Sequence, residues 1–330
     1  MKIDLIIPCY KAHDTLNRCL CSIASQTIAK DITVTLVNDA DGTNYDEYID
    51  RFEGMLDVQV IDLEKNGGPG VARQWGINNT SNPLIMFMDA DDLLFGPFTV
   101  ETLRDSLLKE DNNVMITSSF LEEKGNNFIR HERDMVWMFG KMYKRDFIKK
   151  YDIHFPAHLR CNEDLCFHKQ IGFYLGENEK VKSIANDTYY WMENMNSITR
   201  KNDYEYYYRG SVQGMIDAWI YSIRDAINHN GNKNNIEMFL KSTIGTLYTY
   251  YIQVEERKPQ FKSELWLKCV EFYKTTFSLI RDKMTLADFN KSYEEAMTKA
   301  YAGHKMFDCM PNTSFREFVR MLDKELDKSN

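Results

Sequence analysis

The stretch Leu84-Ile85-Met86-Phe87-Met88-Asp89-Ala90-Asp91-Asp92-Leu93-Leu94 decides how the N-terminal part of this chain folds. Five apolar residues after Pro83 predict a buried strand, and three carboxylates follow where that strand ends. Carboxylates this close repel one another unless a cation neutralises them, and hard divalent ions such as Mg²⁺ and Mn²⁺ prefer oxygen ligands. In an extended segment Asp89 and Asp91 point to the same side, so they are candidates for holding a metal that bridges a diphosphate. The alternative is a solvated acidic turn that caps the next helix.

Strands and helices alternate on the amino-terminal side of this stretch. Apolar runs predict strands at residues 3–7, 33–37 and 58–61, and helical spacing predicts helices at about 15–26, 45–52 and 71–78. Such alternation is typical of an α/β fold with a mostly parallel sheet covered by helices on both faces. Ligands of these sheets bind beyond the carboxyl ends of the strands. The segment Asn38-Asp39-Ala40-Asp41-Gly42 therefore places further carboxylates at the same edge.

A glycine cluster, Asn66-Gly67-Gly68-Pro69-Gly70, precedes the third of these helices. Glycine lets the backbone approach a ligand closely, and a helix amino terminus favours anionic groups. The cluster lacks the Gly-Lys-Ser/Thr of a P-loop and the spacing Gly-x-Gly-x-x-Gly. Taken alone, such a cluster is more often just a tight turn.

Composition limits the class of protein. The chain has 330 residues, 43% of them hydrophobic, and a net charge of −8, which argues against a protein that wraps nucleic acid over its whole surface. The seven cysteines are scattered without a Cys-x-x-Cys pair, which favours reduced thiols. No apolar run approaches the roughly 18 residues that span a bilayer, and no signal peptide precedes the first strand. We therefore expect a cytoplasmic location, with any membrane contact peripheral.

The C-terminal part, residues 204–330, shows only helical patterning. One apolar stripe runs from Val212 to Ile227, and another, from Phe315 to Leu322, follows a Ser314-x-x-Glu317 capping box. Thr285-Leu286-Ala287-Asp288 begins a further helix that Gly303 can end. We predict a catalytic domain at 1–203, divided into halves at 1–92 and 93–203, and a helical domain at 204–330.

Several motifs occur in an order that resembles family 2 glycosyltransferases. They are Ile6-Ile7-Pro8-Cys9-Tyr10, Ser25-Gln26-Thr27, Val37-Asn38-Asp39, Asn66 to Ile77, and Met88-Asp89-Ala90-Asp91-Asp92. The resemblance implies the GT-A fold, a nucleotide-diphosphate sugar as donor, and inversion at the anomeric carbon. Two departures are visible, since Lys11 stands where Asn is usual and Asn38 replaces the first Asp of an Asp-Asp pair.

The resemblance also implies roles for single residues. Asp91 would ligate Mn²⁺ or Mg²⁺, and Asp89 would reach the metal or the ribose. Tyr10 would stack on the nucleotide base, and Asp39 would accept a hydrogen bond from uracil N3–H, which favours a UDP-sugar. The remaining residues expected to contact the nucleotide sugar are Pro8, Gly67, Arg73 and Ala90.

A second set of motifs follows the acidic stretch. Met138 to Arg145 resembles the segment that precedes the acceptor side in bacterial members, and Cys161-Asn162-Glu163-Asp164-Leu165 resembles the motif that carries the catalytic base. Asp164 is the first choice for that base and Glu163 the second, because we expect that adjacent carboxylates at a helix start cannot both point into the cleft. The alternative is a helix cap in which Asp interacts with the helix dipole. Tyr189-Tyr190-Trp191 and Ser197-Ile198-Thr199-Arg200 resemble the strand and loop that close the domain.

We therefore expect a metal-dependent inverting glycosyltransferase. A saccharide acceptor of a surface glycan, free or lipid-linked, is the default by analogy, while a hydroxymethylated DNA base stays open as an acceptor. A nucleotidyltransferase also places Asp-x-Asp near a nucleotide, but Pro8-Cys9-Tyr10 is not the glycine-rich, basic first loop of such enzymes. A silent relative that only binds nucleotide sugar is the third class. The sequence leaves the oligomeric state open.

Overall fold

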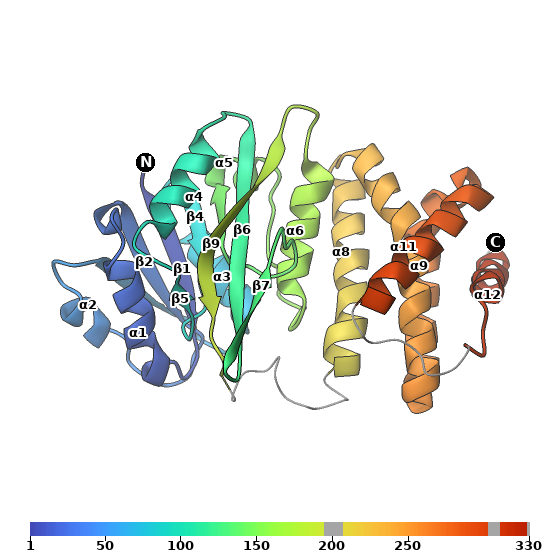
Figure 1. The fold of residues 1–330 in the computed structure, drawn as a ribbon, viewed down its shortest axis with the longest axis horizontal. Helices are drawn as coiled ribbons and strands as arrows, with labels where there is room; N and C mark the ends of the chain where they lie inside the picture. The colour runs from blue at the N-terminus through green and yellow to red at the C-terminus, as the bar shows by residue number, and fades with distance from the viewer. Residues whose placement is uncertain (195–206, 303–310, 329–330) are drawn as a thin grey trace. The chain divides into compact units, whose positions relative to one another are not determined.

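The apolar runs of the N-terminal part form one mixed sheet of nine strands in the computed structural model, which describes residues 1–194, 207–302 and 311–328 (Figure 1). The strand order is β3-β2-β1-β4-β8-β6-β9-β5, with β7 paired to β6. Neighbouring strands are parallel from β3 to β4, and β8 then joins antiparallel to both β4 and β6. The strands are β1 (Ile3–Cys9), β2 (Ile32–Asn38), β3 (Asp57–Asp62), β4 (Leu84–Phe87), β5 (Leu93–Leu94), β6 (Asn113–Lys124), β7 (Asn127–His131), β8 (Lys141–Lys144) and β9 (Lys180–Trp191).

Helices cover both faces of this sheet because the strands are apolar on both sides. Side chains of Ile3, Leu5 and Ile7 share one core with α1, α2 and α4. The intervening Ile6 faces α3, where a Cβ on Gly76 would lie 2.4 Å from Ile6 Cγ2. Phe87 of β4 likewise packs edge-on against Phe167 of α6. The helices are α1 (His13–Ala24), α2 (Glu47–Arg51), α3 (Pro69–Asn78), α4 (Thr99–Leu108), α5 (Arg145–Lys150) and α6 (Glu163–Tyr174).

A buried ion pair fixes the end of the sheet where β1 begins. Arg145 Nη2 lies 2.7 Å from Asp4 Oδ2, and both side chains are 2% exposed. Asp4 also accepts hydrogen bonds from the backbone and side chain of Asn82, and Arg145 donates to the carbonyls of Asn82 and Ile77. Since both charges have partners within the protein, we infer that this cluster stabilises the fold and does not bind a ligand.

The acidic stretch is not extended, contrary to our expectation. β4 ends at Phe87, and the Asp92 amide donates to the Asp89 carbonyl at 3.2 Å, which closes a turn. The alternation that would align Asp89 with Asp91 in a strand therefore does not apply. The turn buries Asp92, whose carboxylate accepts hydrogen bonds from Tyr189 on β9 and from the amide of Met192 just after β9.

The C-terminal part is helical, as the stripes predicted. Its helices are α8 (Gly214–Asn228), α9 (Lys233–Arg257), α10 (Lys262–Thr275), α11 (Leu286–Ala302) and α12 (Phe315–Asp327), with short 3₁₀ and π turns between some of them. The Glu317 amide donates to Ser314 Oγ at 3.2 Å, so Ser314 caps α12 as the sequence indicated. Ile227, at the end of the first stripe, is instead 42% exposed. Gly303 lies outside the described residues.

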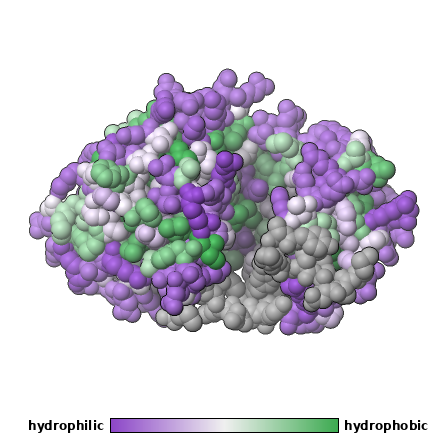
Figure 2. Space-filling view, viewed as in Figure 1, coloured by the Kyte–Doolittle hydropathy of each residue, from purple (hydrophilic) through white to green (hydrophobic). Residues whose placement is uncertain are grey.

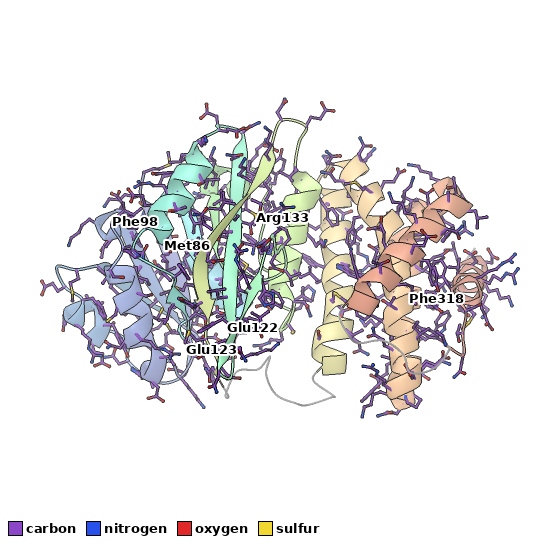
Figure 3. All side chains as sticks on the ribbon, viewed as in Figure 1. Met86, Phe98, Glu122, Glu123, Arg133 and Phe318 are labelled. Atoms are coloured by element: carbon purple, nitrogen blue, oxygen red, sulfur yellow. The ribbon has the colours of Figure 1, made fainter. Side chains whose placement is uncertain are left out.

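The chain divides into two compact units, each with its own core. The first contains Met1–Ile171 and Leu175–Asn202, and the second contains Gly172–Tyr174 and Asp203–Asn330. Figure 3 labels one fully buried side chain of each, Met86 on β4 and Phe318 on α12. Hydrophilic residues predominate on the face drawn in Figure 2, as expected when apolar stripes turn inward.

Candidate active site

The carboxyl ends of three neighbouring strands bring the predicted nucleotide residues to one edge of the sheet. β1 pairs in parallel with β2 and β4, and these strands end at Cys9, Asn38 and Phe87. Tyr10, Asp39 and Asp89 follow these ends directly or within one residue. Tyr10 is 52% exposed, so its ring is available at the surface for stacking. Pro8 lies within β1 and is partly buried, and Ala90 is 8% exposed.

Asp39 fixes the glycine cluster. Its Oδ1 accepts the Gly67 amide at 2.6 Å and its Oδ2 accepts the Gly68 amide at 2.8 Å, while the residue is only 3% exposed. Gly68 has φ of +86°, a conformation that favours glycine. Each carboxylate oxygen can accept a second hydrogen bond, so this geometry leaves capacity for a base N–H. Asp39 therefore has a structural task that the motif did not reveal.

Asp41 organises the loop after β1, and the sequence did not single it out as a site residue. Its carboxylate accepts hydrogen bonds from the Lys11 amide, the Thr43 amide and Tyr45 Oη. Burial raises the pKa of Asp41, but the hydrogen bonds from Thr43, Lys11 and Tyr45 outweigh it and lower the pKa to about 2. Lys11, which has φ of +53°, is thereby held in a left-handed conformation.

Arg73 joins two motifs that are 75 residues apart in the sequence. Its Nη2 lies 2.7 Å from Asp89 Oδ1, and its Nη1 lies 2.7 Å from Asp164 Oδ1 and 3.0 Å from Glu163 Oε1. Arg73 is 2% exposed. Its Nε has no hydrogen-bond partner within the described part of the chain. One buried guanidinium thus holds the acidic stretch and the Glu-Asp motif together.

Glu163 and Asp164 both face this guanidinium, although we expected that only one could. They open α6, and Asn162 before them adopts φ of +62°. Gly70 lets α3 approach, because a Cβ there would lie 2.8 Å from Glu163 Cγ. Burial raises the pKa of both carboxyls, and that of Asp164 well above its usual range, even though Arg73 lowers both. A carboxylate whose pKa is raised binds a proton more strongly, which suits a general base.

The acidic turn contains one fully buried carboxylate and two that are partly exposed. Asp92 is fully buried, and it accepts hydrogen bonds from Tyr189 Oη at 2.7 Å and from the Met192 amide at 2.8 Å. Tyr189 Oη in turn accepts the Asp89 amide at 3.1 Å. Sequence reasoning missed this role of Tyr189, and no local pattern signals it. Asp91 accepts a hydrogen bond from Asn194 Nδ2, and burial together with the nearby Asp89 raises its pKa.

These carboxylates fit a divalent ion that arrives with a diphosphate. Asp89 keeps a side chain that is 34% exposed, and burial together with the nearby Asp89 raises the pKa of Asp91, so a cation between the two carboxylates would be stabilising. No group of three or more His, Cys, Asp or Glu side chains arranged to hold a metal occurs in residues 1–194, 207–302 and 311–328. Mg²⁺ is typically bound by one or two carboxylates plus substrate phosphates, which matches such a sparse set.

Three polar side chains lie buried beside this cluster. His168 of α6 and Tyr143 of β8 form a 2.7 Å hydrogen bond, and burial lowers the pKa of His168 well below its usual range. His168 is therefore neutral and structural. Lys141 of β8 is fully buried, so it does not face solvent. The predicted closing loop at 197–200 lies outside the described residues.

A mixed sheet of this order, with acidic residues gathered at the carboxyl edge of its parallel strands, defines a GT-A domain. Residues 4–160 match the family described as "Glycosyl transferase family 2". This match, over slightly less than half of the chain, is to the family that the order of the motifs predicted. No helix in the described residues is both long enough and apolar enough to cross a membrane.

Relatives and solved structures agree with this family. The chain is 28% identical over 207 residues to the poly(ribitol-phosphate) beta-glucosyltransferase of Bacillus spizizenii, covering 58% of this chain and 32% of that protein. It is 24% identical over 209 residues to the poly(ribitol-phosphate) beta-N-acetylglucosaminyltransferase TarS of Staphylococcus aureus, covering 58% and 35%. The chain thus spans about a third of the length of these relatives. The structure of S. aureus TarS 1-349 in complex with UDP-GlcNAc has the same fold, with a TM-score of 0.68, 16% identity and 95% of both chains covered.

Proposed function

We propose that this chain is a metal-dependent, inverting glycosyltransferase that moves a sugar from a UDP-sugar to a hydroxyl of a surface glycan. The observation that carries the proposal is the bridge made by Arg73, which joins Asp89 at the nucleotide edge to Glu163 and Asp164 on α6. A group transfer needs a site for the leaving diphosphate and a base for the attacking hydroxyl within one substrate length. The bridge brings candidates for both within the reach of a single side chain.

The acceptor class is proposed from the relatives. Two of them are named for transfer to poly(ribitol-phosphate), and a solved structure with the same fold contains UDP-GlcNAc. Both transferases are named as beta-specific, and a beta product from an α-linked nucleotide sugar requires inversion. A polymer of alditol phosphates, or a related surface saccharide, is therefore our proposed acceptor in preference to a DNA base.

Asp164 is the proposed base. Its side chain is 16% exposed against 10% for Glu163, and Glu163 is confined by the close approach of Gly70. The acceptor hydroxyl passes its proton to the Asp164 carboxylate while its oxygen forms the bond to the anomeric carbon. The bond from that carbon to the diphosphate oxygen breaks, and UDP leaves with the electron pair. Arg73 orients the base through Nη1 and limits the repulsion between the adjacent carboxylates.

Asp91 and Asp89 are the proposed metal ligands, with Mn²⁺ or Mg²⁺ as the ion. Such an ion, when bound, would neutralise charge on the leaving diphosphate. The chain's own residues do the remaining work at this edge. Tyr10 stacks on the nucleotide base, and Asp39 accepts a hydrogen bond from the base while it also holds the Gly67 amide. Pro8 and Ala90 contact the nucleotide sugar.

Turnover of UDP-glucose and UDP-N-acetylglucosamine, with poly(ribitol phosphate) as acceptor and with or without Mn²⁺, tests this function. We expect UDP release that depends on both metal and acceptor, and a fall of about 10²- to 10⁴-fold in Asp164→Asn. Glu163→Gln should lose less activity than Asp164→Asn. Turnover by Asp91→Asn should no longer be stimulated by Mn²⁺. Glu47→Gln, a half-exposed carboxylate on α2, is the control and should retain full activity.

Several results would contradict the proposal. Pyrophosphate release in place of UDP would indicate nucleotidyl transfer. Full activity of Asp164→Asn with loss in Glu163→Gln would reassign the base. A UDP-sugar that binds without any turnover or hydrolysis would indicate a silent relative. Binding itself can be followed by thermal shift, because a ligand at 100 times its dissociation constant adds about 2.7 kcal/mol to the free energy of unfolding.

A further inference from the structure

Lys141 is a fully buried lysine that takes no part in the proton transfer or the bond changes of the proposed reaction. It begins β8, and its Nζ donates to the Phe139 carbonyl at 3.1 Å and lies 3.5 Å from Asp134 Oδ1. Asp134 in turn accepts the amides of Val136 and Trp137. Removing an ammonium group from water is costly unless opposite charge compensates it. One carboxylate at 3.5 Å is modest compensation, so a second negative group nearby is expected.

The register of the sheet places Lys141 at the edge that carries the active site. β8 runs antiparallel to β4, with Met142 opposite Met86, so β8 begins where β4 ends. Asp89 follows the end of β4 and is bonded to Arg73, which also holds Asp164. Lys141 and Asp164 are therefore at the same end of the sheet.

The face of the strand points Lys141 toward α6. Side chains alternate along a strand, so Lys141 shares a face with Tyr143, and Tyr143 Oη lies 2.7 Å from His168 Nε2 on α6. Two residues along a strand span about 6.6 Å, and four residues along a helix span about 6 Å. Asp164 precedes His168 by four residues, a spacing that matches the two residues from Lys141 to Tyr143, and the two charges interact electrostatically.

Charged and titratable groups from each neighbouring element face this pair. They are Asp134 before β8, Tyr143 on β8, Glu163, Asp164 and His168 on α6, Arg73 on α3, and Asp89 after β4. Burial lowers the pKa of Lys141 to about 8, while Asp134 and Asp164 raise it. Burial raises the pKa of Asp164, and Arg73 and Lys141 act in the opposite direction. Lys141 and Asp164 thus stabilise each other's charged forms.

We propose that Lys141 is a positioning residue whose buried positive charge keeps Asp164 ionised, and therefore able to accept the proton of the acceptor hydroxyl. This inference rests on the proposed function, because it assigns Lys141 a task through the proposed base. Lys141 itself takes no proton from substrate. The sign of its effect is fixed, since removing a positive charge beside a carboxylate raises the pKa of that carboxylate.

The pH dependence of kcat/KM for sugar transfer tests this role between pH 5 and 9. In Lys141→Met, the acid limb of the pH profile, where kcat/KM falls as pH is lowered, should move up by about one pH unit. Below this limb kcat/KM should be about tenfold lower than in the wild type, and above it kcat/KM should recover. Lys141→Arg retains the charge and should move the limb much less. Lys144→Met is the matched control on the same strand, because its Nζ donates to the Asp111 carbonyl, and the acid limb of its pH profile should not move. A uniform loss at every pH in Lys141→Met would overturn the proposal.

A double-mutant cycle with Asp164→Asn provides a readout without substrate. If the two charges interact, Lys141→Met should lower the Tm at pH 7 by more in the wild-type background than in Asp164→Asn. Lys141→Gln, which can still donate to Phe139, replaces Lys141→Met if the latter does not fold. Equal Tm losses in the two backgrounds of an active enzyme would refute the Lys141 proposal alone. Absence of any sugar transfer by the wild type would refute the proposed function, whatever the cycle shows.

Discussion

Replacing Arg73 by Met should destabilise the first unit strongly, and more so at alkaline pH. Arg73 is 2% exposed and has three carboxylate partners, two of them on side chains that are at most 16% exposed. Removing one partner of a buried charge cluster typically costs about 3 to 5 kcal/mol, because the remaining charges are left buried and unpaired. The partly solvated Asp89 adds little to this estimate.

The pH dependence follows from the raised pKa values of Glu163 and Asp164. A carboxyl whose pKa is higher in the folded than in the unfolded protein weakens folding as pH rises from the unfolded to the folded value. Arg73 lowers both folded pKa values, so Arg73→Met raises them further and extends this loss to higher pH. The difference in free energy of unfolding between variant and wild type should therefore be larger at pH 8 than at pH 5.

Urea denaturation at both pH values measures this difference. Arg51→Met is the matched control, because Arg51 pairs with Glu47 at a distance of 2.9 Å on the surface of α2, with both side chains about half exposed. Its loss should not exceed about 1 kcal/mol at either pH. The reasoning fails if Arg73→Met costs no more than Arg51→Met, or if its cost is the same at pH 5 and pH 8.

Three further changes test the supports of the site and of the C-terminal unit. Tyr189→Phe removes the hydrogen bond to buried Asp92 and should cost about 1 to 3 kcal/mol of stability and weaken Mn²⁺-dependent UDP binding in calorimetry; unchanged binding would separate Asp92 from the metal turn. Gly76→Ala places a Cβ 2.4 Å from Ile6 Cγ2 and should cost about 1 to 3 kcal/mol in urea denaturation, and this cost should be smaller in an Ile6→Ala background, which lacks Cγ2; an equal cost would place the strain elsewhere. Ser314→Ala removes the cap of α12 and should cost about 1 kcal/mol without altering UDP binding, so a changed affinity for UDP would show that the second unit affects the site.

The sequence was sufficient for the order of elements in residues 1–92 and for the edge of the sheet that holds the candidate site. Apolar runs that end at Pro8, Asn38 and Asp89 predict parallel strands whose carboxyl ends meet at one edge of the sheet. They can be recognised because strands buried between two layers of helices have continuous apolar sequences, which is a local pattern. The motif order also identified the family, and the helical stripes and the Ser314 cap were visible for the same local reason.

The contacts between distant motifs were decided only by the tertiary structure. Nothing local indicates that Arg73 bonds to Asp89, Glu163 and Asp164, that Tyr189 holds Asp92, or that Lys141 is buried opposite α6. The expectation of an extended segment from Asp89 to Asp91 was wrong, because Asp92 is buried against partners on β9 and just after it, and the segment forms a turn. Buried charges take the partners that the fold brings near, and those partners are set by how strands and helices pack rather than by spacing along the chain.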